Sequence, residues 1–203
     1  MKLSYIVAKS SSFVTNLFSD RLSPQLCFHN AYHTGNVVID AQEIGLNAGI
    51  SSDELDLVSI AAWFHDTGYT KGYVGHEQLS VAIARDFLME HGLDANQIEK
   101  VTSCILATTF PQRPKNTFEM VLCDADFYHF SRLDYPKFEK SLRKEWATCL
   151  NLHYTDEQWN SLNLEMLTSH KYFTNFGKTV LQERKQKNID WLKRLISIDG
   201  QSL

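Results

Sequence analysis

Apolar residues recur along this chain at helical spacing, and the strict alternation of apolar and polar residues that marks a half-buried strand is absent. The clearest segment opens with the capping-box sequence at 51–54 and continues with apolar residues as far as Phe64. Between Leu57 and Phe64 only Ser59 is polar, so this helix has almost no solvent-facing side. We therefore expect it to lie buried at the centre of the fold.

Further segments carry start or stop signals of helices. They predict a helix from Gly75 to His91, helices that begin after Asp94 and near Thr117, Asp134 and Thr155, and a last helix from about Lys178 to Ile198. Nine glycines and four prolines are few for 203 residues, which favours a small number of long elements. The predicted fold class is all-α, a helical bundle of seven or more helices. We expect one domain over 1–203, with a core at about 25–135 and the helices of 136–198 packed on it.

Composition narrows the function classes. The chain is 43% hydrophobic and 22% charged, as in ordinary soluble domains, and its net charge of −4 excludes a protein that coats nucleic acid. No apolar run is long enough to span a membrane, and the N-terminus does not have the pattern of a signal peptide. The four cysteines form no CxxC pair, which predicts buried thiols in a reducing cytoplasm.

Candidate chemistry gathers at helix ends. His65 and Asp66 close the most hydrophobic predicted helix, where an unpaired buried carboxylate would be costly and a metal ion would compensate it. A hydrogen-bonded His–Asp helix end is the alternative. His29 and His33 lie four residues apart, on one helical face. Imidazole and carboxylate ligands without thiolate favour Mn, Fe, Ni, Co or Zn, with Mg also open.

The order of these residues resembles the HD superfamily of metal-dependent phosphohydrolases, whose signature is H…HD…D on a helical bundle. The matching residues are His33, His65 and Asp66, followed by an aspartate within 122–126, and the resemblance covers about residues 1–195. In that family the last aspartate precedes an apolar residue by about four positions, which selects Asp126. The resemblance thus implies one divalent ion held by these four residues, with Asp124 beside them and a second ion open.

A local resemblance concerns residues 28–34, which are similar to the Y-H-N-x-x-H-A motif of cyclic nucleotide phosphodiesterases. It implies that His29 protonates the leaving oxygen while His33 binds metal. Phe28 and Thr34 depart from the motif, and Thr-Gly-Tyr follows Asp66 where those enzymes have Val-Asp-His. The alternative is that His29 only caps or packs its helix.

In the HD family a histidine at the position of His76 often faces the metal cleft, as a second-metal ligand or a phosphate contact. Glu77 stands beside it at the start of a helix, whose free N–H groups favour anions. A surface histidine is the alternative. Candidate phosphate-binding cations are Lys71, Arg113, Lys115 and Lys171, although a solvated surface charge is the commoner role of such residues.

The resemblance implies hydrolysis of a small-molecule phosphate mono- or diester, a nucleotide or cyclic nucleotide above all, by metal-activated water. Asp66 would orient the water, and His29 or His76 would act as the acid. Two other readings stay open. One is a non-catalytic sensor of nucleotide or metal, and the other is an HD-fold oxygenase with two irons, to which His76 would supply a ligand. The sequence leaves a homodimer open.

Overall fold

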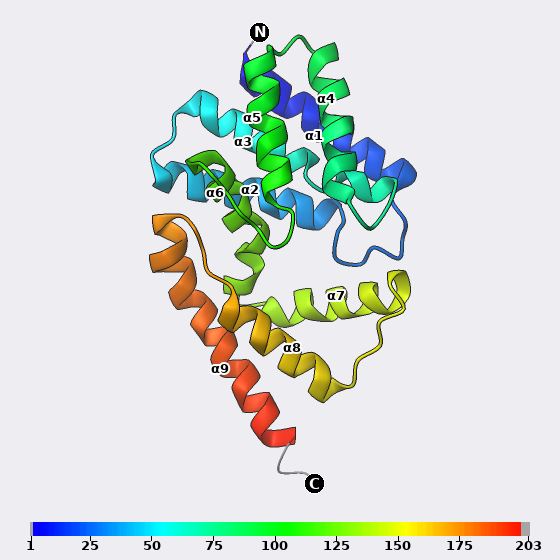
Figure 1. Cartoon of the computed structure of the whole chain (residues 1–203), viewed down its shortest axis with the longest axis vertical. Coiled ribbons are helices and arrows are strands. Elements are labelled where there is room, and N and C mark those ends of the chain that lie inside the picture. The colour runs from blue at the N-terminus through cyan, green and yellow to red at the C-terminus, as the bar shows by residue number, and fades with distance from the viewer. Residues whose placement is uncertain (1, 200–203) are drawn as a thin grey trace.

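The computed structural model describes residues 2–199, and within that range every regular element is a helix. The upper part of the molecule in Figure 1 holds six α-helices and a 3-10 turn. These are α1 (Leu3–Arg21), α2 (Ala31–Ala48), α3 (Ser52–Phe64), η1 (Thr67–Thr70), α4 (His76–Glu90), α5 (Ala95–Ala107) and α6 (Thr117–Asp126). The lower part follows with η2 (Phe127–Ser131), α7 (Tyr135–Cys149), α8 (Asp156–Ser169), the π-helical turn η3 (Gly177–Leu181) and α9 (Gln182–Asp199). The predicted all-α fold is confirmed.

Several helices begin where their capping residues predict. Ser51, Asp94 and Thr155 each form a complete capping box, in which the cap side chain and the N3 side chain bond each other's backbone N–H. The predicted start of the last helix at about Lys178 falls within a continuous helical stretch, in which a π-helical turn at Gly177–Leu181 leads directly into α9.

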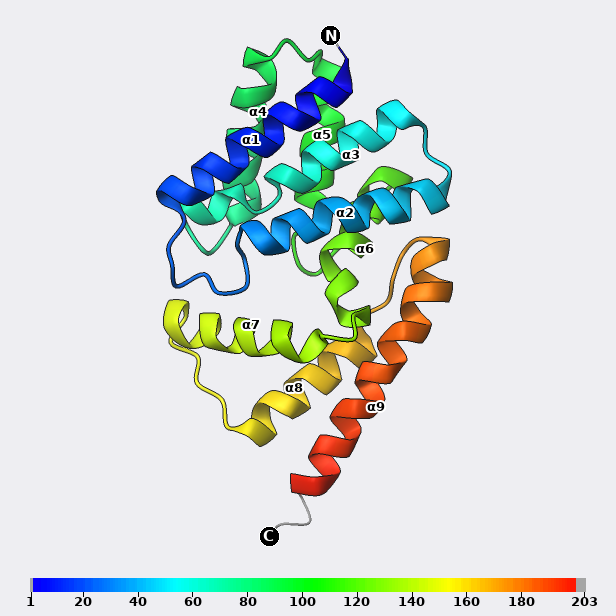
Figure 2. The same ribbon diagram turned by 180° about the vertical axis from the view of Figure 1, so that it is seen from behind.

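The prediction that the helix ending at Phe64 lies buried at the centre of the fold also holds. This helix is α3, and its residues Ile60, Ala61 and Phe64 are fully buried. This helix contacts α1, α2, α5 and α6, as Figure 2 shows from behind. The large core of the upper part forms around it, and each metal-ligand candidate lies at the edge of that core.

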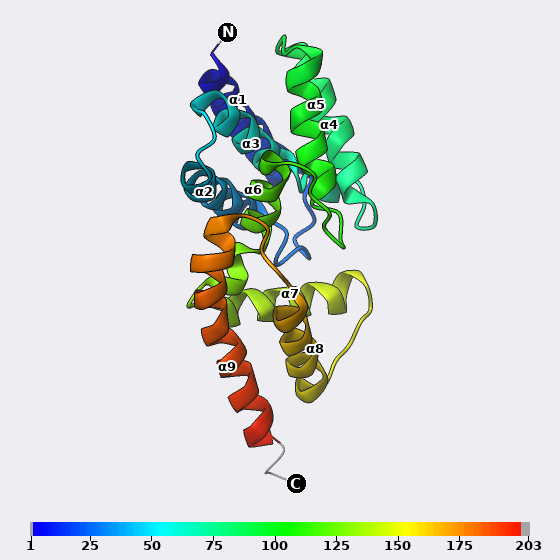
Figure 3. The same ribbon diagram turned by 60° about the vertical axis from the view of Figure 1, so that its left-hand side comes forward.

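A second, smaller core joins η2, α7, α8 and α9 through Phe130, Tyr135, Leu167, Ile189 and Leu192. In Figure 3 α9 runs along the side of the lower part, and α7 and α8 lie beneath the upper bundle. The division of the chain into a core at 25–135 with packed C-terminal helices remains a prediction.

Hydrogen bonds tie the two parts together. A single guanidinium nitrogen of Arg132, Nη2, donates to both carboxylate oxygens of Asp40 on α2, at 2.6 and 2.8 Å. All four cysteines are free thiols, but only Cys104 and Cys123 are buried as predicted, and Cys27 and Cys149 are half-buried. Across residues 2–199, no helix has both the length and the apolar character needed to cross a bilayer.

Candidate functional site

Three helices bring the four candidate metal ligands to one point. His33 lies on α2, His65 and Asp66 directly follow α3, and Asp126 is the last residue of α6. His65 Nε2 is 3.1 Å from Asp66 Oδ2, and His33 Nε2 is 3.4 Å from the same oxygen. Asp126 Oδ1 lies 3.3 Å from His33 Nε2 and 3.7 Å from His65 Nε2. The four predicted ligands therefore converge from chain positions up to 93 residues apart.

Local structure fixes each imidazole. The Asn30 side chain caps α2 by accepting from the backbone N–H of Tyr32 and His33, which sets His33 in the first helical turn. His65 donates from Nδ1 to the Ala62 carbonyl at 2.7 Å, so the lone pair of its Nε2 faces the cluster.

Ser80 of α4 holds the turn after Asp66 in place. Its hydroxyl donates to the His65 carbonyl at 2.6 Å and accepts from the backbone N–H of Gly68 at 2.8 Å. A Cβ on Gly68 would stand 1.9 Å from the His76 carbonyl oxygen, so only glycine allows this approach of the turn to α4. The close contact sets His76 beside the cluster.

The donor set fits a divalent cation. His33 Nε2, His65 Nε2 and Asp66 Oδ2 are buried without a hydrogen-bond partner, and ligand atoms of these residues all lie within 4.8 Å of one another. Buried polar atoms of this kind normally have partners. Two imidazole nitrogens and carboxylate oxygens aimed at one point supply what a metal ion needs.

Electrostatics give the same indication. Burial opposes charge on His65, but the carboxylates of Asp66 and Asp126 outweigh burial and raise its pKa to about 9. Burial likewise opposes ionisation of Asp66, yet the neighbouring imidazoles hold its pKa below the ordinary value. The cluster thus stabilises positive charge, which a metal ion would supply in place of a proton.

The two downstream aspartates separate clearly. Asp126 faces the cluster and also accepts from Gln112 Nε2 at 3.3 Å. Asp124 is fully buried elsewhere, where it accepts from the backbone N–H groups of Phe173 and Thr174 at 2.8 and 2.9 Å and from the Thr174 hydroxyl at 2.6 Å. Asp124 therefore anchors the segment before α9, and its carboxylate is not beside the ligands as the sequence had predicted.

His29 stands next to the cluster with its own carboxylate partner. It lies in the bend before α2, because Asn30 is the extended N-cap of that helix, so the prediction that His29 and His33 share one helical face is wrong. Its Nδ1 is 2.5 Å from Oε1 of Glu145, a buried residue of α7 whose other oxygen accepts from the backbone N–H groups of Phe28 and His29. The Tyr73 hydroxyl donates to Glu145 as well. Burial lowers the pKa of His29, but the bond to Glu145 and the charge of Asp66 more than offset this and raise it. Nε2 is then the nitrogen left to face the cleft.

Tyr69 packs against both candidate acids. Its ring stacks on His29 with centroids 4.4 Å apart and on His76 at 3.9 Å. His76 Nε2 lies 3.6 Å from Asp66 Oδ1, and its Nδ1 lies 3.6 Å from Glu77 Oε2. The structure therefore places His76 and Glu77 where the sequence predicts a second ion or a phosphate contact.

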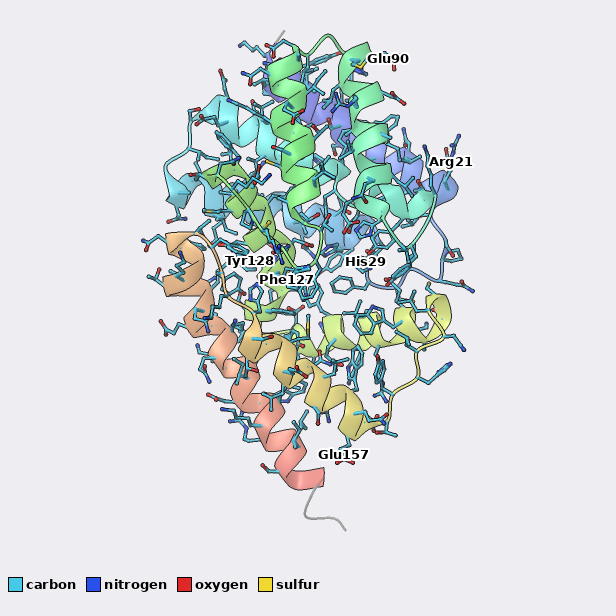
Figure 4. The ribbon with its side chains drawn as sticks, viewed as in Figure 1. Arg21, His29, Glu90, Phe127, Tyr128 and Glu157 are labelled. Atoms are coloured by element: carbon cyan, nitrogen blue, oxygen red, sulfur yellow. The ribbon has the colours of Figure 1, made fainter. Side chains whose placement is uncertain are left out.

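A cavity of about 390 Å³ opens over this cluster between the upper bundle and α7 and α8. His29, Asp66, His76 and Asp126 line one end. Figure 4 shows His29 and Phe127 at the level where the bundle faces α7. The other end is apolar, with Phe130, Leu142, Trp146, Leu150, Leu162 and Met166 in its wall.

The four predicted cations lie outside this cavity. Lys71 is exposed in a separate surface hollow beside Lys9 and Arg21. Arg113 and Lys115 are exposed in the loop before α6, and Lys171 lines a neighbouring groove on the far side of Phe127. None of these four side chains lines the cavity over the metal-ligand cluster, where the sequence analysis expects the phosphate.

Sequence reasoning missed Glu145, Tyr69, Ser80 and the apolar wall. Tyr69 and Ser80 do fall within the stretches that match the HD pattern, so proximity to Asp66 in the chain was an available signal. Glu145 is 116 residues from His29 and sits in an ordinary-looking charged helix. Only the packing of α7 under the bundle brings it to the site.

Comparisons with known proteins agree with this geometry. The HD domain family matches residues 30–131, half of the chain. No curated protein matches. Among solved structures, Bacillus subtilis YpgQ in complex with ADP has a TM-score of 0.68 at 17% identity, covering 96% of this chain and 95% of its own.

A predicted HD superfamily hydrolase from an uncultured Thermotogales bacterium has a TM-score of 0.60 at 18% identity, covering 94% of this chain and 91% of its own. At such identities the likeness concerns the fold. The matched span, however, holds His33, His65, Asp66 and Asp126, which together support a metal-dependent hydrolase. The chain belongs to the HD-domain family.

Proposed function

We propose that this protein is a metal-dependent phosphohydrolase that cleaves a small-molecule phosphate mono- or diester, with nucleotides as the first class to test. The observation that carries the proposal is the convergence of His33, His65, Asp66 and Asp126 at the mouth of a cavity that also holds His29. The complex of YpgQ with ADP, in a related fold, adds support for nucleotides.

When bound, a divalent cation would activate water and neutralise charge on the phosphoryl group. The chain's own residues supply the rest. Asp66 has one oxygen toward His33 and His65 and the other toward His76, so it can orient a water molecule between the two groups. The buried cluster excludes bulk water from behind, because His65 and Asp66 are almost fully covered.

His29 is the proposed acid. Glu145 holds its Nδ1, so a proton on Nε2 points toward the cleft, and the bond to Glu145 raises the pKa of His29, which favours the protonated form that an acid needs. Its ring centroid is 5.8 Å from that of His33. His29 lies outside α2, so this closeness comes from the bend before the helix and not from a helical turn. The ring is close enough to reach an ester oxygen on a phosphate held at the cluster.

The test is turnover by metal-analysed protein on mono-, cyclic and diphosphate nucleotides with Mn, Ni, Co and Mg, in wild type and His29→Ala. His29→Ala should lower kcat by about 10²-fold or more on esters with alkoxide leaving groups while metal occupancy stays unchanged. The loss should shrink on nitrophenyl esters, whose leaving group needs no proton. An equal loss on both ester types would exclude an acid role.

Other outcomes identify the competing functions. Stoichiometric metal with nucleotide binding but no turnover on any ester would make the protein a sensor. Consumption of dioxygen by the iron-loaded protein would indicate an oxygenase, for which His76 stands 3.6 Å from Asp66 as a further ligand.

A further inference from the structure

The cavity over the metal cluster is chemically one-sided. Its cluster end holds the titratable groups, whereas the far end is built from aromatic and aliphatic side chains of η2, α7 and α8. Trp146 and Trp159 meet there edge to face, with ring centroids 5.6 Å apart. A surface of this kind favours a planar apolar group through burial and stacking.

The polar atoms at the apolar end already have partners within the protein. Trp159 donates through Nε1 to Glu139. The Asn163 amide accepts from the Tyr135 hydroxyl at 2.5 Å and donates to the Trp159 carbonyl at 2.8 Å. Recognition of a base by hydrogen bonds needs free donors and acceptors in the wall. The cited bonds use part of the hydrogen-bonding capacity of Trp159 and Asn163 within the protein, and the rest of the wall is apolar, so shape contributes most to selection at this end.

Among the described residues, none that carries a permanent positive charge lines the cavity. No lysine or arginine from the part of the chain that the structure describes lines this cavity. Lys171, one of the predicted phosphate-binding residues, lines a neighbouring groove. Phe127 lines both that groove and the cavity. A chain of two or three phosphates carries charge that side-chain cations or metal ions normally balance. The cluster can balance one phosphoryl group, and a volume of about 390 Å³ is near the small end for ligand pockets.

We propose that the site takes esters with a single phosphorus atom and one planar apolar group, which the α7–α8 wall holds by shape and not by reading hydrogen bonds. Nucleoside monophosphates belong to this class, and nucleoside di- and triphosphates do not; in this respect the chain would differ from YpgQ, whose solved structure is a complex with ADP. The inference rests on the proposed function for its placement of the phosphoryl group at the cluster.

Binding to the Mn-loaded protein, measured by calorimetry, tests the proposal without turnover. Benzylphosphonate should bind at least about tenfold more tightly than methylphosphonate, because only the former buries a ring. AMP and CMP should differ by less than about 10²-fold, as expected when a pocket selects by size. ADP should bind no more tightly than AMP.

Two variants locate the effect. Trp146→Ala and Met166→Ala should each reduce the benzyl-to-methyl ratio toward one while leaving methylphosphonate affinity unchanged. Leu152→Ala is the matched control. Leu152 lies shortly after α7, the helix that carries Trp146, but its side chain is 40% exposed and does not line the cavity. If either wall variant fails to fold, the other still decides.

Equal affinity for the two phosphonates, or ADP bound tenfold more tightly than AMP, would overturn the inference even if esters are hydrolysed. Apolar preference without hydrolysis of any ester would instead support this ligand class and count against the proposed function. Failure of every phosphonate and nucleotide to bind would reject both.

Discussion

The two ends of the cleft come from different parts of the molecule. All four candidate metal ligands belong to the upper bundle, where they border a core that includes Ile60, Phe64 and Leu122 at full burial. The apolar wall comes from α7 and α8, whose own core is a smaller cluster around Tyr135 and Leu167. In the proposed function, the upper part, which has the larger core, would hold the ion, and the lower part, which has the smaller core, would hold the variable group of the substrate.

This division has a physical reason. A metal site tolerates little error in ligand position, so its residues belong on elements fixed from several sides. An apolar wall works by area and shape, and it can change residue by residue without disturbing the ligands. Glu145 is the exception, because it stands on α7 and reaches His29 across the cleft. Through it, the lower part aligns the acid that the upper part carries.

The largest effect should follow from removing the central carboxylate. Asp66→Ala should abolish metal binding and lower kcat/KM by more than about 10³-fold, since a metal contributes several kcal/mol to such reactions. The upper core around α3 stays packed, so the far-UV circular dichroism spectrum should be unchanged. Metal content by mass spectrometry is the primary measurement, and stoichiometric metal in this variant would contradict the ligand assignment.

Substitution of Asp124 and of Asp126 should have opposite effects on stability and on metal binding. Asp124→Ala removes three hydrogen bonds that hold Phe173 and Thr174, so it should lower the free energy of unfolding by about 3 kcal/mol and leave metal affinity intact. Asp126→Ala should weaken metal binding with little change in stability. Denaturant titration and metal titration of both variants check this pair. Loss of metal in Asp124→Ala alone would reverse the assignment.

Glu145→Gln tests the link between the two parts. The amide keeps an oxygen that accepts from the backbone N–H groups. It loses the negative charge that orients the His29 ring and favours its protonated form. We expect kcat to fall by about ten- to a hundredfold on alkyl esters and to change little on nitrophenyl esters. The control is Lys144→Gln, an exposed neighbour on the same helix. Equal losses on both ester types would make Glu145 a purely structural residue.

The sequence predicted those features that depend on residues close together in the chain, such as the starts of helices. Ser51, Asp94 and Thr155 signal helix starts because a cap bonds backbone only two or three residues away. Helix α1 was not predicted, and its first residue follows Lys2, which makes no side-chain cap bond. The predicted ligands were found through an ordered pattern that a family resemblance supplied.

Contacts between distant segments were beyond the sequence. Nothing near Asp124 indicates that its partners lie 49 and 50 residues away, so its placement beside the ligands was an error of tertiary structure. The exposed lysines and Arg113 were chosen by charge, which does not reveal the direction of a side chain. The wall of the cleft likewise looks like ordinary core in the sequence, because apolar helix faces line cavities and cores alike.

The smallest expected effect concerns a buried charge in the lower part. Lys185 of α9 is fully buried and donates to the His170 carbonyl at 2.6 Å, and its ammonium lies 5.2 Å from the centre of the Tyr172 ring. Burial lowers its pKa from 10.5 to about 8. Between those values the unfolded chain binds more protons than the folded one, so this residue makes stability rise with pH across that window.

Lys185→Met should therefore remove a rise of about 2 kcal/mol in the free energy of unfolding between pH 8 and 10. The loss of one hydrogen bond to a carbonyl partly offsets the gain from removing the buried charge, so stability at pH 7 should change little. Denaturant titrations of both proteins across this pH range provide the measurement, and subtracting one curve from the other cancels the tyrosines and cysteines that titrate in each. The same slope in both proteins would show that Lys185 keeps its ordinary pKa, and with it that the lower part is open enough to hydrate an ammonium group.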